Sequence, residues 1–323
     1  MDLRIGTIAL RGRTMLAPMA GFTDMTYRSI CREHGCDFTF TEMISAKGLK
    51  YGGKSADLME TAPNERPCGI QLFGRDPDIM AEMARRICGE NKGELALIDI
   101  NMGCPAPKIT GNGEGSALMK EPGVAARVIE AVVKASALPV SVKFRKGWDS
   151  GHVNCVEFAR MAEGSGAAFV TIHGRTRDQM YSGAADWEVI AEAKAALSIP
   201  VIGNGDVTGG SSAIAMRDYT GCDGIMIARG ALGNPYVFQE VKAAFAGVPY
   251  TPPSNAERLD LAIAHVRGLV AHKGPHGVIE MRKHIAYYVR GMKGASAFRT
   301  AATLAPTAEA LIEMIEEYKS SLE

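Results

Sequence analysis

Short apolar runs alternate with helical segments from residue 13 to about residue 230. The runs are rich in β-branched residues and show no clean alternation of apolar and polar positions, which favours strands buried on both faces, as in a parallel sheet. Eight such strands are predicted, at residues 14–19, 38–43, 68–73, 96–101, 140–144, 169–173, 201–204 and 224–228. Helices are predicted between them at residues 26–34, 77–88, 122–135, 154–164, 186–196 and 210–219, and the Asp76–Pro77 pair predicts an N-cap followed by proline at the first helical position.

Eight strand–helix units over this length predict a (β/α)8 TIM barrel, a fold of the α/β class. An open doubly wound sheet is the alternative, and it is disfavoured because no G-x-G-x-x-G motif follows the first strand. Residues 48–55, GLKYGGKS, match the pattern G-x-x-x-x-G-K-[ST], which would indicate a nucleotide hydrolase. A chance match is favoured, since four residues separate this segment from the preceding strand and it belongs to the second of eight units.

The character of the chain changes after the barrel. A proline-rich linker begins near residue 248, and helices without strand signals are predicted at residues 256–272, 277–290, 295–302 and 306–321. Pro306 is expected at the first position of the last helix. The sequence therefore predicts a barrel domain at residues 1–247 and a small all-helical domain at residues 248–323.

The predicted helical domain has an uneven charge distribution. Residues 265–299 carry seven basic residues and one glutamate (net +6), whereas residues 300–323 carry one lysine and five glutamates (net −4). Arg282, Lys283 and Arg290 fall within a sector of about 100° on one predicted helix at 3.6 residues per turn. A solvated basic face is one interpretation. Beside a catalytic barrel, the sector is also a candidate for contact with a nucleic-acid phosphate backbone.

Overall composition excludes few functions. The chain has 323 residues, of which 46% are hydrophobic and 22% charged, and its formal net charge is zero, so any surface for nucleic acid must be local. Seven cysteines without a C-x-x-C spacing argue against a disulfide framework or a zinc site and favour the reducing cytoplasm. No run of ~18 apolar residues predicts a membrane span, and no metal site is predicted.

Polar and glycine residues gather at the carboxyl ends of the last two predicted barrel strands. Asn204, Gly205 and Asp206 end the seventh strand and begin its loop, and Ala228 and Arg229 do the same for the eighth. Loops at these two places commonly bind a phosphate through backbone N–H groups in (β/α)8 enzymes. A pair of ordinary tight turns is the alternative.

A flat heteroaromatic cofactor would explain the remaining groups at the predicted mouth. An amide suits the imide edge of a flavin ring, and a lysine suits negative charge on the reduced ring. Each group alone could be an ordinary strand-end side chain, but together with the phosphate loops they favour flavin mononucleotide (FMN). Pro18, Met19 and Ala20 would form an apolar ledge after the first strand. Gln71 would supply the amide, Lys143 the cation and His173 an imidazole.

Cys104 lies in the segment DINMGCP, directly after the fourth predicted strand, and a glycine-rich loop follows it. A free cysteine is often a small buried hydrophobe. Facing a cofactor, a thiol with an ordinary pKa near ~8.5 would be mostly protonated at pH 7 and able to donate a proton. A nucleophilic role would need an activating base.

Several motifs together resemble the tRNA-dihydrouridine synthase family, and most closely its bacterial B-type branch. The combination of DINMGCP, GSALM and HGRTR is specific, whereas LAPM and NGD also occur in other flavin barrels. The resemblance runs from about residue 4 to residue 320 and is carried by LAPMAGFTDMTYR (16–28), TEM (41–43), IQLFG (70–74), DINMGCP (99–105), GSALM (115–119), HGRTR (173–177), PVIGNGD (200–206), MIARGALGNPYVF (226–238) and RKHIAYYVRG (282–291).

The resemblance implies an FMN-bearing barrel, NADPH as electron donor, and a helical domain that cradles tRNA, without an obligatory protein partner. Reduced flavin would pass hydride to C6 of a uracil that has left its stack, and Cys104 would protonate C5. Asn101 and Arg175 would contact the target nucleotide. The residues that would hold FMN are Pro18, Met19, Ala20, Gln71, Lys143, His173, Asn204, Gly205, Asp206, Ala228 and Arg229.

Two other functions stay open at the level of the sequence. An FMN barrel reductase of a small molecule, such as a free pyrimidine, is disfavoured by the basic helical segment and by DINMGCP. A tRNA-binding protein without catalysis is disfavoured by the presence of Cys104, Gln71, Lys143 and His173. The loop at 110–115 lacks the basic residues that many relatives carry at Gly111 and Asn112, which leaves its part in RNA contact open.

Overall fold

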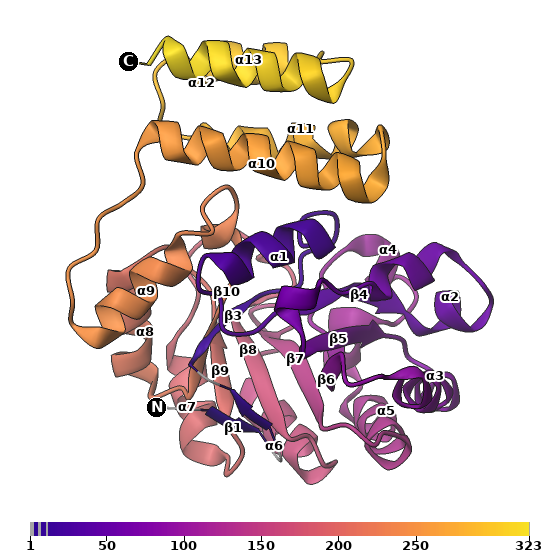
Figure 1. The fold of residues 1–323 in the computed structure, drawn as a ribbon. Helices are drawn as coiled ribbons and strands as arrows, with labels where there is room; N and C mark the ends of the chain where they lie inside the picture. Colours follow the sequence, from indigo (N-terminus) through magenta and orange to yellow (C-terminus); the bar gives the residue numbers. More distant parts are fainter. Residues whose placement is uncertain (1–2, 6–7, 11, 323) are drawn as a thin grey trace.

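A ring of parallel strands forms the larger part of the molecule in the computed structural model, which describes residues 3–5, 8–10 and 12–322 (Figure 1). Eight strands pair in the order β3-β10-β9-β8-β7-β6-β5-β4. A parallel bridge between Met15 and Phe38 joins the first and last of these strands, and the Leu16 amide donates to the Phe38 carbonyl over 3.0 Å. The predicted (β/α)8 barrel is confirmed, and the open doubly wound alternative is wrong.

All eight predicted strands are present, with differences at their ends. The first ends at Leu16 instead of residue 19, shortly before Pro18, which has no amide hydrogen for a sheet ladder. The fifth and sixth strands continue three residues further than expected, through polar and glycine residues that read as loop. The strands are β3 (Thr14–Leu16), β4 (Phe40–Ser45), β5 (Cys68–Phe73), β6 (Leu95–Met102), β7 (Val140–Gly147), β8 (Phe169–Thr176), β9 (Val201–Asn204) and β10 (Gly224–Ile227).

Helices cover the outside of the strand ring, as the alternating pattern predicts. The Asp76 carboxylate caps α3 by accepting from the amides of Asp78 and Ile79 over 3.0 and 3.2 Å, so the predicted N-cap is confirmed. The α-helices of this part are α1 (Met25–Glu33), α2 (Ala46–Lys50), α3 (Pro77–Glu90), α4 (Pro107–Thr110), α5 (Pro122–Ala135), α6 (Cys155–Gly164), α7 (Glu188–Ala196), α8 (Gly210–Thr220) and α9 (Val237–Ala246), and the 3-10 helices are η1 (Lys54–Met59), η2 (Pro63–Glu65), η3 (Gly115–Lys120) and η4 (Arg229–Ala231).

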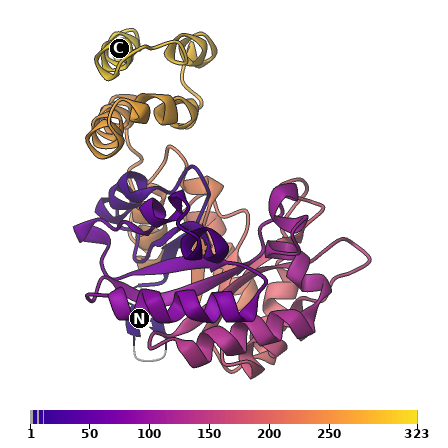
Figure 2. The same ribbon diagram turned by 90° about the vertical axis from the view of Figure 1, so that its right-hand side faces the viewer.

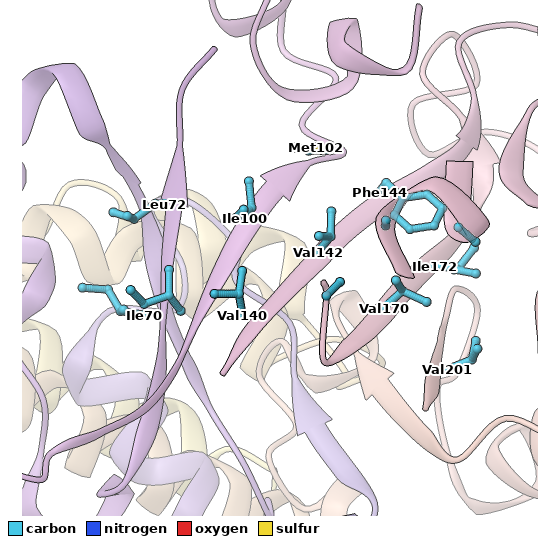
Figure 3. Close-up of a cluster of buried hydrophobic side chains, with 14 of the residues drawn as sticks. Ile70, Leu72, Ile100, Met102, Val140, Val142, Phe144, Val170, Ile172 and Val201 are labelled. Carbon is cyan, nitrogen blue, oxygen red and sulfur yellow. The ribbon is translucent and has the colours of Figure 1, made fainter. Parts of the chain in front are cut away.

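The outward-facing side chains of the strands form the main hydrophobic core against these helices. Ile98 and Ile100 of β6 and Val142 of β7 are fully buried there. Figure 3 shows a row of such aliphatic side chains along neighbouring strands. Because both faces of the strands are covered, their apolar runs are nearly continuous.

The interior of the barrel changes from apolar to polar toward the carboxyl ends of the strands. Leu97 and Phe169 belong to an apolar interior cluster. Side chains two positions apart share one face of a strand, so β6 continues inward with Asp99 and then Asn101, and β8 continues inward from Phe169 through Thr171 to His173. The polar end of this interior is where the sequence predicts the site.

Two features of the N-terminal half differ from or refine the sequence reading. A two-stranded antiparallel hairpin, β1 (Leu3–Ile5) with β2 (Ile8–Leu10), precedes the barrel and was not predicted. Gly48, the first glycine of the G-x-x-x-x-G-K-S match, lies inside α2, and its carbonyl accepts from the Gly53 amide over 2.8 Å. A nucleotide-binding loop would need this backbone open between a strand and a helix, so that interpretation is wrong.

Four helices follow the linker: α10 (Asn255–Lys273), α11 (His276–Tyr288), α12 (Ala295–Ala302) and α13 (Ala308–Ser320). They have a hydrophobic core of their own, and Figures 1 and 2 show two layers, with α10 and α11 facing the barrel. The all-helical character of this part is confirmed, whereas the boundary between residues 247 and 248 stays a prediction.

Two details of the predicted helices are wrong. Pro306 precedes the last helix, since Thr307 is its N-cap and accepts from the Ala310 amide over 3.2 Å. Helix α11 ends at Tyr288, so Arg290 lies beyond it and does not share a helix face with Arg282 and Lys283.

Aromatic and charged contacts join the helical layers to α1 of the barrel. Tyr27 packs against the imidazoles of His265 and His284, with ring centroids 5.2 and 5.4 Å apart, and all three side chains are buried. Beside them, the Lys273 ammonium lies 2.8 Å from the Asp24 carboxylate. These contacts place the helical domain over the same end of the barrel as α1.

A buried ion pair fixes the segment between β4 and β5. Arg28 donates to both carboxylate oxygens of Glu65 over 2.8 and 3.0 Å, and the two side chains are 2% and 0% exposed. Glu65 also accepts from the Thr39 hydroxyl and the Ala62 amide. Because every contact of the pair is internal, neither charge can be solvated if its partner is lost.

Glu65→Ala is expected to lower the free energy of unfolding by about 3–5 kcal/mol, because it leaves the Arg28 guanidinium buried without a counter-charge. Glu90→Ala is the matched control: it removes an exposed pair with Arg86 on α3 and is expected to change stability by less than about 1 kcal/mol. Urea denaturation measures both variants. Equal losses of unfolding free energy in the two variants would show that the buried Arg28–Glu65 pair stabilises the fold no more than an exposed pair does.

Candidate functional site

A large cavity opens at the carboxyl ends of the barrel strands and extends to the helical domain. Its volume is about 1180 Å³, which exceeds the usual size of a small-molecule site. It is lined by loops after β3, β6, β8, β9 and β10 and, at its outer end, by Tyr250, Arg258 and Arg290. The cavity therefore joins the barrel mouth to the part of the chain that carries the basic segment.

Most of the residues predicted for the site line this cavity. These residues come from separate strands and converge on the cavity, because the carboxyl ends of the strands in a barrel meet at one rim. The predicted cofactor residues that line it are Pro18, Met19, Ala20, Lys143, His173, Asn204, Gly205, Asp206, Ala228 and Arg229, and they are joined by Asn101, Cys104 and Arg290.

Four predicted residues do not line the cavity. Gln71 is fully buried below it, and Arg175 is 2% exposed and donates to the carbonyls of Ser182 and Gly183. Arg282 is half-buried and donates to the Ala305 carbonyl between α12 and α13, and the Lys283 ammonium lies 5.5 Å from the ring centroid of Phe22. None of these four side chains lines the cavity, so any effect on a bound molecule would pass through a neighbouring residue.

Cys104 is held at the edge of the cavity by backbone contacts on both sides. Its amide donates to the Asn101 side-chain carbonyl over 2.9 Å, and its own carbonyl accepts from the Ser116 amide and hydroxyl over 3.0 and 2.9 Å. Gly115 has a φ of +60°, and a Cβ there would lie 2.8 Å from the Cys104 carbonyl oxygen. The glycine-rich loop therefore packs directly on the cysteine.

The electrostatics of the mouth keep the thiol protonated. Burial raises the pKa of Cys104 above its ordinary value, although the nearby Arg145 and Lys143 charges work in the opposite direction. Burial, with the charge of Arg145, lowers the pKa of Lys143 to about 8, so the ammonium is still mostly protonated at pH 7. Burial also lowers the pKa of His173 well below its usual range, which leaves a neutral imidazole.

The loops after β9 and β10 form a charged rim. Asp206 has a φ of +59°, and its carboxylate accepts from Arg175 and from the Ala185 amide over 2.8 and 2.7 Å. Gly205 has a φ of +127°, which a residue with a side chain rarely adopts. Arg229, whose guanidinium lies 3.8 Å from Asp206, keeps its side chain 46% exposed.

Two residues of the mouth were missed by the sequence reading. Arg145 is buried and donates to the carbonyls of Gly103, Thr176 and Met180, which ties the cysteine loop to the loop after β8. Tyr181 is 54% exposed, and the Arg229 guanidinium lies 4.8 Å from its ring centroid. Alternation along β7 could have revealed Arg145, two positions after Lys143, but no local pattern identifies Tyr181.

The outer end of the cavity combines arginines with an aromatic ring. Arg258 donates to the carbonyls of Tyr288 and Arg290 over 2.6 and 3.0 Å. The Arg290 side chain is exposed, and its guanidinium lies 5.1 Å from the ring centroid of Tyr287.

Among the described residues, none of the helices has the length and apolar character needed to cross a membrane.

Comparisons with known proteins agree with this geometry. The family model described as dihydrouridine synthase (Dus) matches residues 15–323. The chain is 42% identical over 299 residues to "Probable tRNA-dihydrouridine synthase 1" of Synechocystis sp., covering 92% of this chain and 83% of the relative. It is 39% identical to "tRNA-dihydrouridine synthase B" of Xanthomonas campestris pv. campestris (99% and 96% covered) and 38% identical to "Probable tRNA-dihydrouridine synthase" of Rickettsia conorii (99% and 97% covered). The chain therefore belongs to the dihydrouridine synthase family.

Proposed function

We propose that this protein is a tRNA-dihydrouridine synthase that reduces the C5=C6 bond of specific uridines in tRNA with FMN as bound cofactor and NADPH as electron donor. The observation that carries the proposal is the half-buried Cys104 thiol, which faces the same cavity as Lys143 and His173. The names of the family and of its similar members, all dihydrouridine synthases, support the same reaction.

The residues around the cavity fit FMN. Gly205 and Gly230 bring backbone close to the rim, and Arg229 supplies an exposed cation beside them, which suits a phosphate. Lys143 offers a cation deeper in the mouth, donating to the Asn204 side-chain carbonyl over 3.2 Å. Gln71, predicted at the imide edge of the ring, would instead support this site from below, since it is fully buried.

When bound and recharged by NADPH, FMN would supply the hydride that adds to C6 of the uracil. Cys104 would hold a proton on Sγ and give it to C5, because burial keeps the thiol protonated. Lys143 would place positive charge near the negative charge that develops in the mouth. His173, being neutral, would add no charge of its own there.

The target uridine would have to leave its stack in the tRNA to enter the barrel mouth. The Asn101 side chain accepts from the Cys104 amide and donates to Gln71 and, over 3.7 Å, to the Met43 sulfur, so a contact to the base would replace the weak bond to that sulfur. At the outer end of the cavity, Arg290 would meet the phosphate backbone, with Arg282 and Lys283 on α11 behind it. Arg175 would act on the nucleotide only through the loop it holds.

Cys104→Ala is expected to keep the yellow cofactor and NADPH oxidation while losing at least about 100-fold in turnover on unmodified tRNA, the usual scale for a general acid. Dihydrouridine formed is measured by mass spectrometry, and flavin by its visible absorbance. Cys88→Ala is the matched control, because Cys88 lies on α3 outside the cavity. Unchanged turnover in Cys104→Ala would refute the proton-donor role, and a colourless wild-type protein would refute the cofactor.

Lys283→Glu combined with Arg290→Glu is expected to weaken tRNA binding at least about fivefold and to lower the dependence of log Kd on log salt by one to two. Arg85→Glu combined with Lys92→Glu changes the net charge equally and alters exposed positions at and beyond α3, so its affinity should stay near that of the wild type. Equal weakening in both double variants would indicate a nonspecific charge effect.

A further inference from the structure

A chain of hydrogen bonds runs inside the barrel from a buried carboxylate to the loop that carries Cys104. Asp99 accepts from the Gln71 side-chain amide over 2.6 Å, and Gln71 accepts from the Asn101 amide over 2.8 Å. The Asn101 carbonyl then accepts from the backbone amides of Gly103 and Cys104 over 3.1 and 2.9 Å. Two side-chain amides therefore connect Asp99 to the first residues of the cysteine loop.

Sheet register brings the members of this chain together. Gln71 of β5 is paired with Asp99 of β6, and Asp99 with Ser141 of β7, so the three side chains share one level of the barrel interior. The Ser141 hydroxyl donates to the second oxygen of Asp99 over 2.5 Å. Asp99 and Gln71 are 1% and 0% exposed, so water does not compete for these bonds.

The two ends of the chain fix its direction. An ionised carboxylate can only accept, so Gln71 must turn its NH₂ group toward Asp99 and its carbonyl toward Asn101. Backbone amides can only donate, so Asn101 must turn its carbonyl toward Gly103 and Cys104. Turning either side-chain amide around would place donor against donor in a dry interior, where an unmade hydrogen bond is costly. Burial raises the pKa of Asp99 to about 6, which still leaves the carboxylate mostly ionised at pH 7.

We propose that Asp99 is a positioning residue for Cys104, because its carboxylate sets the orientation of the Gln71 and Asn101 amides and thereby the acceptor that holds the Cys104 backbone. Ser116 holds the carbonyl side of the cysteine independently, so the chain from Asp99 controls the amide side. The consequence for turnover rests on the proposed function, whereas the consequence for the backbone does not.

Hydrogen–deuterium exchange of the holoprotein tests the backbone part directly. A peptide spanning residues 102–107 has few exchangeable amides, since Pro105 and Pro107 have none. Asp99→Leu should lower protection at Gly103 and Cys104 by about tenfold, the scale of one lost hydrogen bond. Asp99→Asn should stay within about twofold of the wild type, because its carbonyl can accept from Gln71 and its NH₂ can donate to Ser141.

Thr171→Val is the matched control for a change inside the barrel. Thr171 is buried on β8, and its hydroxyl has no hydrogen-bond partner in the part of the chain that the structure describes, so the isosteric valine removes no contact of this kind. Its exchange pattern should equal that of the wild type. Increased exchange along all the barrel strands in Asp99→Leu, rather than at the cysteine loop, would mean that Asp99 is only a structural residue and would overturn the proposal.

Gln71→Met keeps the test decisive if Asp99→Leu does not fold. It breaks the next link while leaving Asp99 and Ser141 in place, and it should expose the same two amides to exchange. Protection that stays at the wild-type value in Gln71→Met would overturn the proposal.

Kinetics on unmodified tRNA separate this proposal from the proposed function. Asp99→Leu should lower kcat at least about tenfold at saturating FMN, and Asp99→Asn should restore it to within about threefold of the wild type. If the wild-type protein forms no dihydrouridine but the exchange pattern follows the chain, the proposed function fails and the positioning role stands. If wild-type turnover is present and Asp99→Leu keeps both protection and kcat, the positioning role fails alone.

Discussion

Buried polar side chains inside the barrel pair mostly with one another, because an unpaired buried polar group costs about 1–3 kcal/mol. Among the described residues, the Thr171 hydroxyl is an exception. This constraint shapes the whole upper interior. Asp99, Gln71 and Asn101 satisfy one another in a single chain that ends on the backbone of Cys104. Lys143 and Asn204 form a second contact at the mouth. Below this level the interior is filled by apolar side chains such as Phe40 and Leu97, which need no such matching. The hydrogen-bonded polar side chains therefore gather at the end of the barrel that opens into the cavity.

The same constraint explains how the site is divided between residues that reach the cavity and residues that hold them. Arg145 is buried, and its guanidinium donates to the carbonyls of Gly103, Thr176 and Met180. It therefore joins the cysteine loop to the end of β8 and the loop that follows. Arg175 likewise holds the loop near Asp206. Lys143 and Cys104 line the cavity, and burial shifts their pKa values in opposite directions, which favours a protonated thiol and a less basic amine. A site of this kind depends on its supporting contacts as much as on its reactive atoms.

The helical domain completes the cavity without contributing a reactive group. Its contacts with α1, through Tyr27, His265 and the Asp24–Lys273 pair, place Arg258 and Arg290 at the outer end of the space that begins in the barrel. The sequence identified the basic segment by composition but assigned Arg290 to the helix of Arg282 and Lys283. Helix α11 ends two residues earlier, so Arg290 lies beyond it and lines the cavity, while Arg282 is half-buried and donates to the connection between α12 and α13.

The sequence by itself determined the strand–helix alternation, the barrel, the helical appendage and the family motifs, because these depend on local periodicity, on turn residues and on short segments that stay contiguous in the chain. It also identified most of the cavity-lining residues, since strand ends in a barrel converge on one rim. Only the tertiary structure decided that Gln71 and Arg175 are buried and do not line the cavity, that Tyr181 lines it, and that hydrogen bonds link Asp99 to Cys104. Those relations depend on register between strands and on loop paths that bring residues from different units together, and no pattern within one segment records them.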